Sequence, residues 1–226
     1  MRLSVHSLFF MLLAMPLTIF ASVDLEQSPQ QFVLETTQVH IPNHPHALNA
    51  SIVQRGGSLL MSFREIDAVE YPPVLSSGKS TIALAWLDEN FSPINEPQLL
   101  DLRLNNLATP SRAEDARLII VDQHLYMTYS DNRLLRVTDG GFRMHLVELE
   151  YDGEIFHVID HDCLSLFENA HPRRREKNWV PFNYEGNLLF AYSLAPHKIF
   201  LPFIGSGRCA TVANTGHDLQ EKWRWG

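Results

Sequence analysis

The sequence predicts an all-β fold of the β-propeller kind, with about three blades, and two observations lead to it. First, a short apolar run, a polar turn and a second apolar run occur three times, over residues 51–64, 117–131 and 178–193. Aligned on Leu60, Tyr126 and Phe190, the copies are spaced by 66 and 64 residues (126−60 and 190−126). Second, the runs are rich in Val, Ile, Leu, Phe and Tyr, and turn residues separate them. Repeated hairpins at this spacing are typical of propeller blades.

The predicted strands follow in order along the chain. Residues 23–41 are expected to form a leading strand or arm. The first hairpin turns at 55–58, and a third strand over 80–87 precedes a turn at 88–90. The second copy repeats this order, with a hairpin, a turn at 139–141, a strand over 144–149 and a turn at 151–153. The third copy adds strands over 198–203 and 209–213, joined at 205–207. We therefore expect one propeller domain over 22–226, with blades at about 47–105, 112–162 and 175–226.

Size and charge limit the classes of function. The chain has 226 residues, of which 45% are hydrophobic and 19% charged, and this composition is typical of a globular domain with a real core. Its formal net charge of −8 leaves no broad basic field, so we expect no nucleic-acid partner.

The first residues indicate a targeting segment. Arg2 precedes an apolar run of 13 residues, Leu8 to Phe20, which is too short for a comfortable membrane span. Small residues follow it, so we expect a signal peptide over 1–21, export of the mature protein and no stable membrane span after cleavage. An uncleaved anchor is the alternative. Export would permit a disulfide between Cys163 and Cys209, and two unpaired buried cysteines are the equally weighted alternative.

Hairpin geometry gathers polar residues at one end of the repeats. The start of the first strand of an antiparallel pair lies beside the end of the second. Asn49 and Ser51 are therefore expected near Arg64, and the pair Asp115 and Arg117 near Asp131. In the third copy, Lys177 and Asn178 are expected near Ser193 and His197. If the blades share an axis, these corners form one small-molecule site.

Two segments are candidates for chemistry. In Glu114-Asp115-Ala116-Arg117, strand alternation places Asp115 and Arg117 on one face and Glu114 on the other. A nearby Arg favours a charged carboxylate, whereas a general acid needs burial or a second carboxylate, for which Asp131 is the candidate. An ion pair bracing the strand is the alternative.

The second segment opens the third copy with Glu176-Lys177-Asn178-Trp179. Trp179 suits sugar recognition, and a core Trp with a satisfied N–H is the alternative. His40, His44 and His46 match no familiar zinc spacing, so we expect no metal and no cofactor.

A family resemblance rests on five segments in order: Asn49-Ala50-Ser51, Phe63-Arg64, Glu114-Asp115-Ala116-Arg117, Glu176 to Phe182, and Tyr192 to His197. Together they resemble the five-bladed β-propeller glycosidases, closest to the mannoside phosphorylase and mannosidase branch. The resemblance implies a glycan substrate and makes Asp115 the proton donor, although Ala116 stands where the motif has proline. It also implies that Arg64, Arg117, Lys177 and Asn178 bind sugar hydroxyls or phosphate.

The resemblance implies five blades, whereas the sequence has three copies of the pattern. We therefore expect a truncated propeller with open blade edges, which invite self-association. The leading hypothesis is an exported, carbohydrate-active protein that acts on a mannoside-type glycan by acid catalysis, or the inactive, truncated remnant of such a protein. The alternative is a noncatalytic propeller module that binds a glycan or a protein.

Overall fold

The computed structural model describes residues 38–66, 80–103, 112–131, 141–171 and 174–215, and among these it contains strands but no helix. The expected all-β class is therefore confirmed for this part of the chain. In the same part, no helix has the length and apolar character that a membrane crossing requires. The predicted signal peptide and leading arm lie almost wholly outside the described residues.

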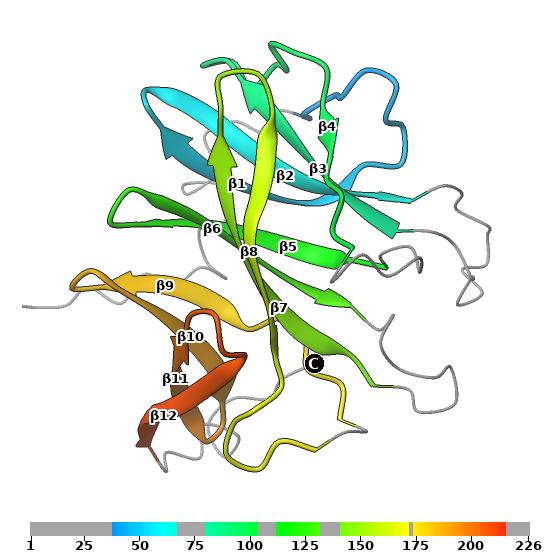
Figure 1. Ribbon diagram of the computed structural model, residues 1–226. Helices are drawn as coiled ribbons and strands as arrows, with labels where there is room; N and C mark the ends of the chain where they lie inside the picture. The colour runs from blue at the N-terminus through cyan, green and yellow to red at the C-terminus, as the bar shows by residue number, and fades with distance from the viewer. Residues whose placement is uncertain (1–37, 67–79, 104–111, 132–140, 172–173, 216–226) are drawn as a thin grey trace, which may run out of the picture. The chain divides into compact units, whose positions relative to one another are not determined.

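Within the described residues, twelve strands form three antiparallel four-stranded sheets, each with its strands in chain order (Figure 1). Sheet 1 contains β1 (Leu48–Arg55), β2 (Ser58–Ile66), β3 (Ser80–Leu87) and β4 (Gln98–Leu99). Sheet 2 contains β5 (Glu114–Val121), β6 (His124–Asp131), β7 (Arg143–Tyr151) and β8 (Phe156–Leu164). Sheet 3 contains β9 (Val180–Tyr184), β10 (Asn187–Leu194), β11 (His197–Phe203) and β12 (Arg208–Thr215).

The same two-residue turn joins the first two strands of every sheet. Both central residues have positive φ in each turn: Gly56 and Gly57, Asp122 and Gln123, Glu185 and Gly186. This is the type I′ conformation, whose twist matches that of the flanking strands. Glycine, Asn and Asp tolerate such φ values best, and they occupy four of these six positions.

The turns correct the alignment of the third repeat. From Gly56 to Asp122 is 66 residues, and from Asp122 to Glu185 is 63 (185−122). Leu189, rather than Phe190, therefore matches Leu60 and Tyr126, as the pairing of Phe182 with Leu189 also requires. The expected spacing of 64 is therefore wrong by one residue, because an apolar pattern alone does not fix the register. The error matters because a shift of one residue moves every side chain of a strand to the opposite face.

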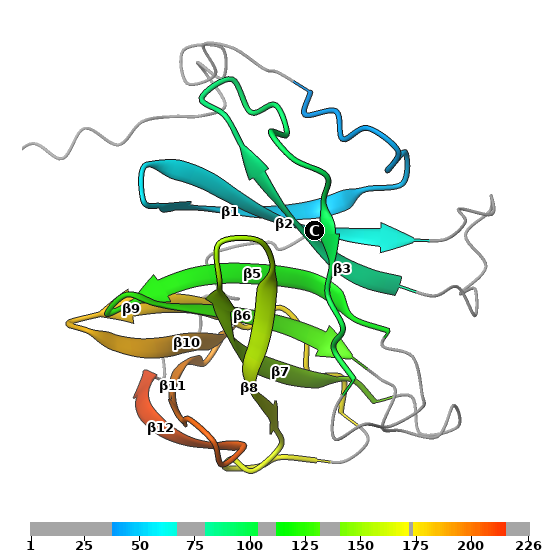
Figure 2. The ribbon, with the colours of Figure 1, turned by 45° about the horizontal axis from the view of Figure 1, so that its top comes forward.

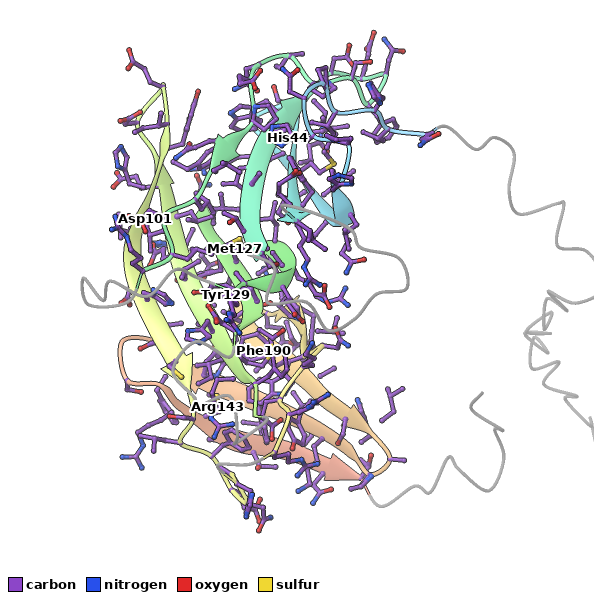
Figure 3. All side chains as sticks on the ribbon, turned by 90° about the vertical axis from the view of Figure 1, so that its right-hand side faces the viewer. His44, Asp101, Met127, Tyr129, Arg143 and Phe190 are labelled. Atoms are coloured by element: carbon purple, nitrogen blue, oxygen red, sulfur yellow. The ribbon has the colours of Figure 1, made fainter. Side chains whose placement is uncertain are left out.

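Sheet 2 has both faces buried. One apolar cluster joins residues of sheets 1 and 2, including Leu60, Ile82 and Met127. A second joins sheets 2 and 3 and includes Leu146, Phe190 and Trp179. Figure 3 shows Met127, Tyr129 and Phe190 in the interior. Since each sheet buries an apolar face against the next, stacking of the sheets supplies the core.

The outer faces of sheets 1 and 3 differ. Beyond sheet 1, a third cluster packs Met61 and Phe63 against Ile41, which lies in the segment preceding β1. Sheet 3 instead carries large apolar side chains that are about half exposed: Val180, Tyr184, Leu194, Phe203 and Val212. The expectation of self-association through open blade edges stays a prediction.

The first strands of the sheets lie next to one another. β5 contacts both β1 and β9, and Figure 2 shows the three strands running side by side. The hydroxyl of Ser51 on β1 accepts a hydrogen bond from the backbone N–H of Leu118 on β5, at 3.0 Å. The starts of these strands, where the sequence concentrates polar residues, are thereby brought to one place.

Cys163 and Cys209 are both described, and no disulfide joins them. The disulfide alternative is therefore not realised in this structure. Cys209 is 7% exposed, and burial raises the pKa of its thiol to about 12.

Candidate functional site

The same backbone conformation recurs at the opening of each repeat. Asn49, Asp115 and Asn178 have φ values of 53°, 56° and 59°, and they are spaced by 66 and 63 residues, as the turns are. These φ values are left-handed, a conformation that Asn and Asp tolerate better than most residues. The three positions are therefore structural equivalents, and the backbone explains why each is an Asx residue.

In sheets 1 and 2 this conformation belongs to a β-bulge. The register shifts between Leu48 and Ser51 and again between Glu114 and Arg117. A bulge re-aims side chains, because it interrupts strict alternation. Strict alternation would place Glu114 on the face opposite Asp115. The bulge interrupts that alternation, and the guanidinium of Arg64 contacts both carboxylates.

A pocket of about 260 Å³ lies where the three repeats open. Its lining residues come from all three: Asn49, Ala50, Asp115, Ala116, Arg117 and Asn178. The three left-handed residues thus line one pocket, although 129 residues separate the first from the last (178−49). Ala50 and Ala116 follow the first two of them, and small side chains there leave the pocket open.

Asp115 is held by donors from sheet 1. The side-chain amide of Asn49 donates to Oδ1 of Asp115 at 2.5 Å, and the Nη1 atom of Arg64 lies 3.7 Å from the same oxygen. A donor and a cation at this oxygen stabilise the negative charge of the carboxylate. The second carboxylate expected to aid proton donation, Asp131, is not among the pocket residues.

Glu114 links the cations around the pocket. Its Oε1 accepts from Nη2 of Arg64 at 3.2 Å, and its Oε2 accepts from the ammonium of Lys177. Arg64 is further fixed by Ser80, whose hydroxyl accepts from Nε at 2.7 Å and donates to the carbonyl of Ala113 at 2.5 Å. Lys177 also lies 3.8 Å from the ring centre of Phe142. This network joins all three repeats and fixes both cations.

Arg117 differs from Arg64 and Lys177. It lines the pocket, but it forms no ion pair with any carboxylate of the described residues. Its Nε is buried and has no hydrogen-bond partner. The pocket therefore presents one guanidinium whose charge is not balanced by a neighbouring carboxylate.

Six predicted site residues do not line this pocket. Arg64 and Lys177 belong to the ion-pair network beside it. The other four are Trp179, Asp131, Ser51 and His197. Trp179 is 1% exposed and donates its indole N–H to Glu176 at 3.3 Å, so the core alternative is correct and a sugar platform at Trp179 is wrong. Asp131 is 2% exposed and accepts a hydrogen bond from the backbone N–H of Arg112 at 3.3 Å. Because it is buried, its carboxylate is not accessible to a ligand in the pocket. Ser51 bonds to β5, and His197 begins β11 opposite Leu194 and Thr215.

Sequence reasoning missed the role of Glu114 as the link between Arg64 and Lys177. The signal available was the recurrence of an Asx residue at the same distance before each turn, which predicts a bulge and hence broken alternation. No group of three or more His, Cys, Asp or Glu side chains suited to a metal occurs among the described residues. Of the His-rich segment, His44 stacks edge-on against Phe63 and contacts Glu65 at 3.2 Å.

Comparison of this chain with known proteins finds similarity to a solved structure. No family model matches the chain, and no curated protein does. The crystal structure of the α-L-arabinofuranosidase from Lactobacillus brevis is similar, with 14% sequence identity and a TM-score of 0.44. The similarity covers 75% of this chain and 50% of that one, so this chain spans about half the length of that protein.

Proposed function

We propose that this chain is a carbohydrate-active protein of the β-propeller glycosidase kind, whose three sheets are blades and whose pocket binds a glycan. One observation carries the proposal: Asn49, Asp115 and Asn178 occupy equivalent places in three repeats and line a single pocket. Polar side chains that converge from separate elements on a concave site are the usual mark of a ligand site.

The chemistry of the lining suits a sugar. The amide of Asn178 offers both donors and an acceptor, Asp115 offers acceptor oxygens, and Arg117 offers donors in a fixed fork. Hydroxyl groups act as donors and acceptors at once, so a polyhydroxylated ring can satisfy all three. The resemblance of the sequence motifs to the mannoside branch supports a mannoside-type glycan, and the apolar leader supports export.

Within this proposal Asp115 is the proton donor to the glycosidic oxygen. The test is turnover of an aryl mannoside by Asp115→Asn, which preserves both the shape of the side chain and its tolerance of positive φ. We expect turnover to fall by about a hundredfold or more, since that is the usual contribution of a general acid. Mannoside affinity should change by only a few fold. Unchanged turnover would remove Asp115 from the chemistry.

A noncatalytic glycan-binding module is the second candidate, and the surroundings of Asp115 favour it. The Asn49 amide donates to Oδ1 of Asp115, and the Arg64 guanidinium lies 3.7 Å from the same oxygen, so protein groups already engage the carboxylate that would have to face a glycosidic oxygen. Measurable mannoside binding by the unaltered chain, with no release of sugar from any aryl glycoside tested, would select this candidate over the enzyme.

A further inference from the structure

We infer that the glycan bound in this pocket carries a carboxylate, as a uronic acid does, and that Arg117 holds it. This inference rests on the proposed function, because it names the class of sugar that the same pocket takes.

Arg64, Lys177, Glu114 and Asp115 form one ion-paired group beside the pocket. Arg64 is within 4 Å of both Glu114 and Asp115, and Lys177 bonds to Glu114. These two cations and two anions balance one another. Arg117 remains, and no carboxylate of the described residues lies within ion-pair distance of it.

The position of Arg117 directs its charge to a ligand. Its side chain lines the pocket, while its Nε is buried without a hydrogen-bond partner. The guanidinium therefore has no carboxylate partner within the described residues, although its side chain lines the pocket. A carboxylate bound in the pocket would supply that partner, and its two oxygens match the guanidinium fork.

The rest of the lining excludes a purely anionic ligand. Asp115 lines the same pocket and would repel a small anion that lay close to it. A ligand that places its carboxylate at Arg117 and its hydroxyl groups at Asp115 and Asn178 meets both demands. A sugar acid has this arrangement, whereas inorganic phosphate has no neutral part to lie against Asp115.

The experiment compares two ligands that differ only at C6, methyl mannoside and its uronate, by titration calorimetry on the full chain at pH 7. We expect the uronate to bind at least tenfold more tightly. Arg117→Gln should bring the two dissociation constants within about twofold, and Arg117→Lys should keep part of the preference. Arg103→Gln is the matched control, since Arg103 is exposed, pairs with Asp101 and lies outside the pocket.

The measured affinities decide whether Arg117 binds a carboxylate of the glycan. Equal affinity for the two ligands, or a preference that survives Arg117→Gln, would overturn the inference and leave the proposed function standing. Phosphate binding without a uronate preference would also overturn it. If neither sugar binds, the proposed function fails as well. Should Arg117→Gln not fold, the unaltered chain still tests the charge, because 0.5 M NaCl should weaken uronate binding severalfold and leave the mannoside unchanged.

Discussion

The side-chain amide of Asn49 donates a 2.5 Å hydrogen bond to the carboxylate of Asp115, 66 residues further along the chain. The two residues hold equivalent places in sheets 1 and 2, and both have left-handed φ values. The bond therefore joins two copies of one repeated position. It ties the candidate catalytic carboxylate to the neighbouring sheet as well as to its own strand.

We predict a coupling free energy between these two side chains. Asn49→Gly and Asp115→Gly each remove one partner and leave the left-handed backbone unstrained. In a double-mutant cycle of urea unfolding, the coupling should be about 0.5–1.5 kcal/mol, the usual value for a hydrogen bond near solvent. Strictly additive effects would mean that the bond contributes nothing to stability.

The backbone and side-chain roles of Asn178 can be separated. Asn178→Ala removes the side chain from the pocket and also places alanine at a φ of 59°, which costs about 1–2 kcal/mol. Asn178→Gly removes the same side chain without that strain. We expect both variants to lose glycan affinity equally, measured by calorimetry, while only Asn178→Ala loses stability. Full affinity in Asn178→Gly would show that Asn178 serves the backbone alone.

Trp179→Ala should destabilise the fold by about 3–5 kcal/mol, measured by chemical denaturation, because a large cavity forms in the core. Its ring lies 5.3 Å from the rings of Phe167 and Phe200 and is 1% exposed. A stable Trp179→Ala variant that had lost only glycan affinity would contradict the burial of this side chain.

Gly207 is expected to resist substitution more than Gly56. Both have positive φ, but a Cβ at Gly207 would lie 2.6 Å from the carbonyl oxygen of Cys163, whereas one at Gly56 meets nothing within 4 Å. Gly56→Ala should therefore cost only the backbone strain of about 1–2 kcal/mol. Gly207→Ala should cost clearly more in the same denaturation assay, and equal losses would place the Cys163 carbonyl elsewhere.

Cys209 should react slowly with iodoacetamide. Burial raises the pKa of its thiol to about 12, so at pH 9 only about one thousandth of it is thiolate. The chain unfolded in guanidinium, where both thiols are ordinary, is the control. Because the folded pKa is raised, the stability that the neutral thiol contributes is present below about pH 9 and is lost as the pH rises toward 12. Rapid labelling of folded Cys209 would contradict its burial.

The class of fold and the repeat follow from the pattern of residues along the chain. Apolar runs of alternating type, separated by turn residues, lead to strands, and the strand predicted over 80–87 coincides with β3. The same pattern placed the polar openings of the repeats together, and Asn49, Asp115, Arg117 and Asn178 do line one pocket. These are properties of local pattern and of antiparallel pairing, which act over few residues.

The contacts of each of these side chains depend on how the strands and sheets pack together. Bulges at Asn49 and Asp115 break the alternation on which the sequence argument relied, so Glu114 reaches Arg64 and Lys177. Trp179 is buried in one apolar cluster with Leu146 of sheet 2, and Asp131 is also buried. Register, burial and charge balance arise from contacts between strands and between sheets. The residue pattern of one strand does not identify which distant residues pack against it.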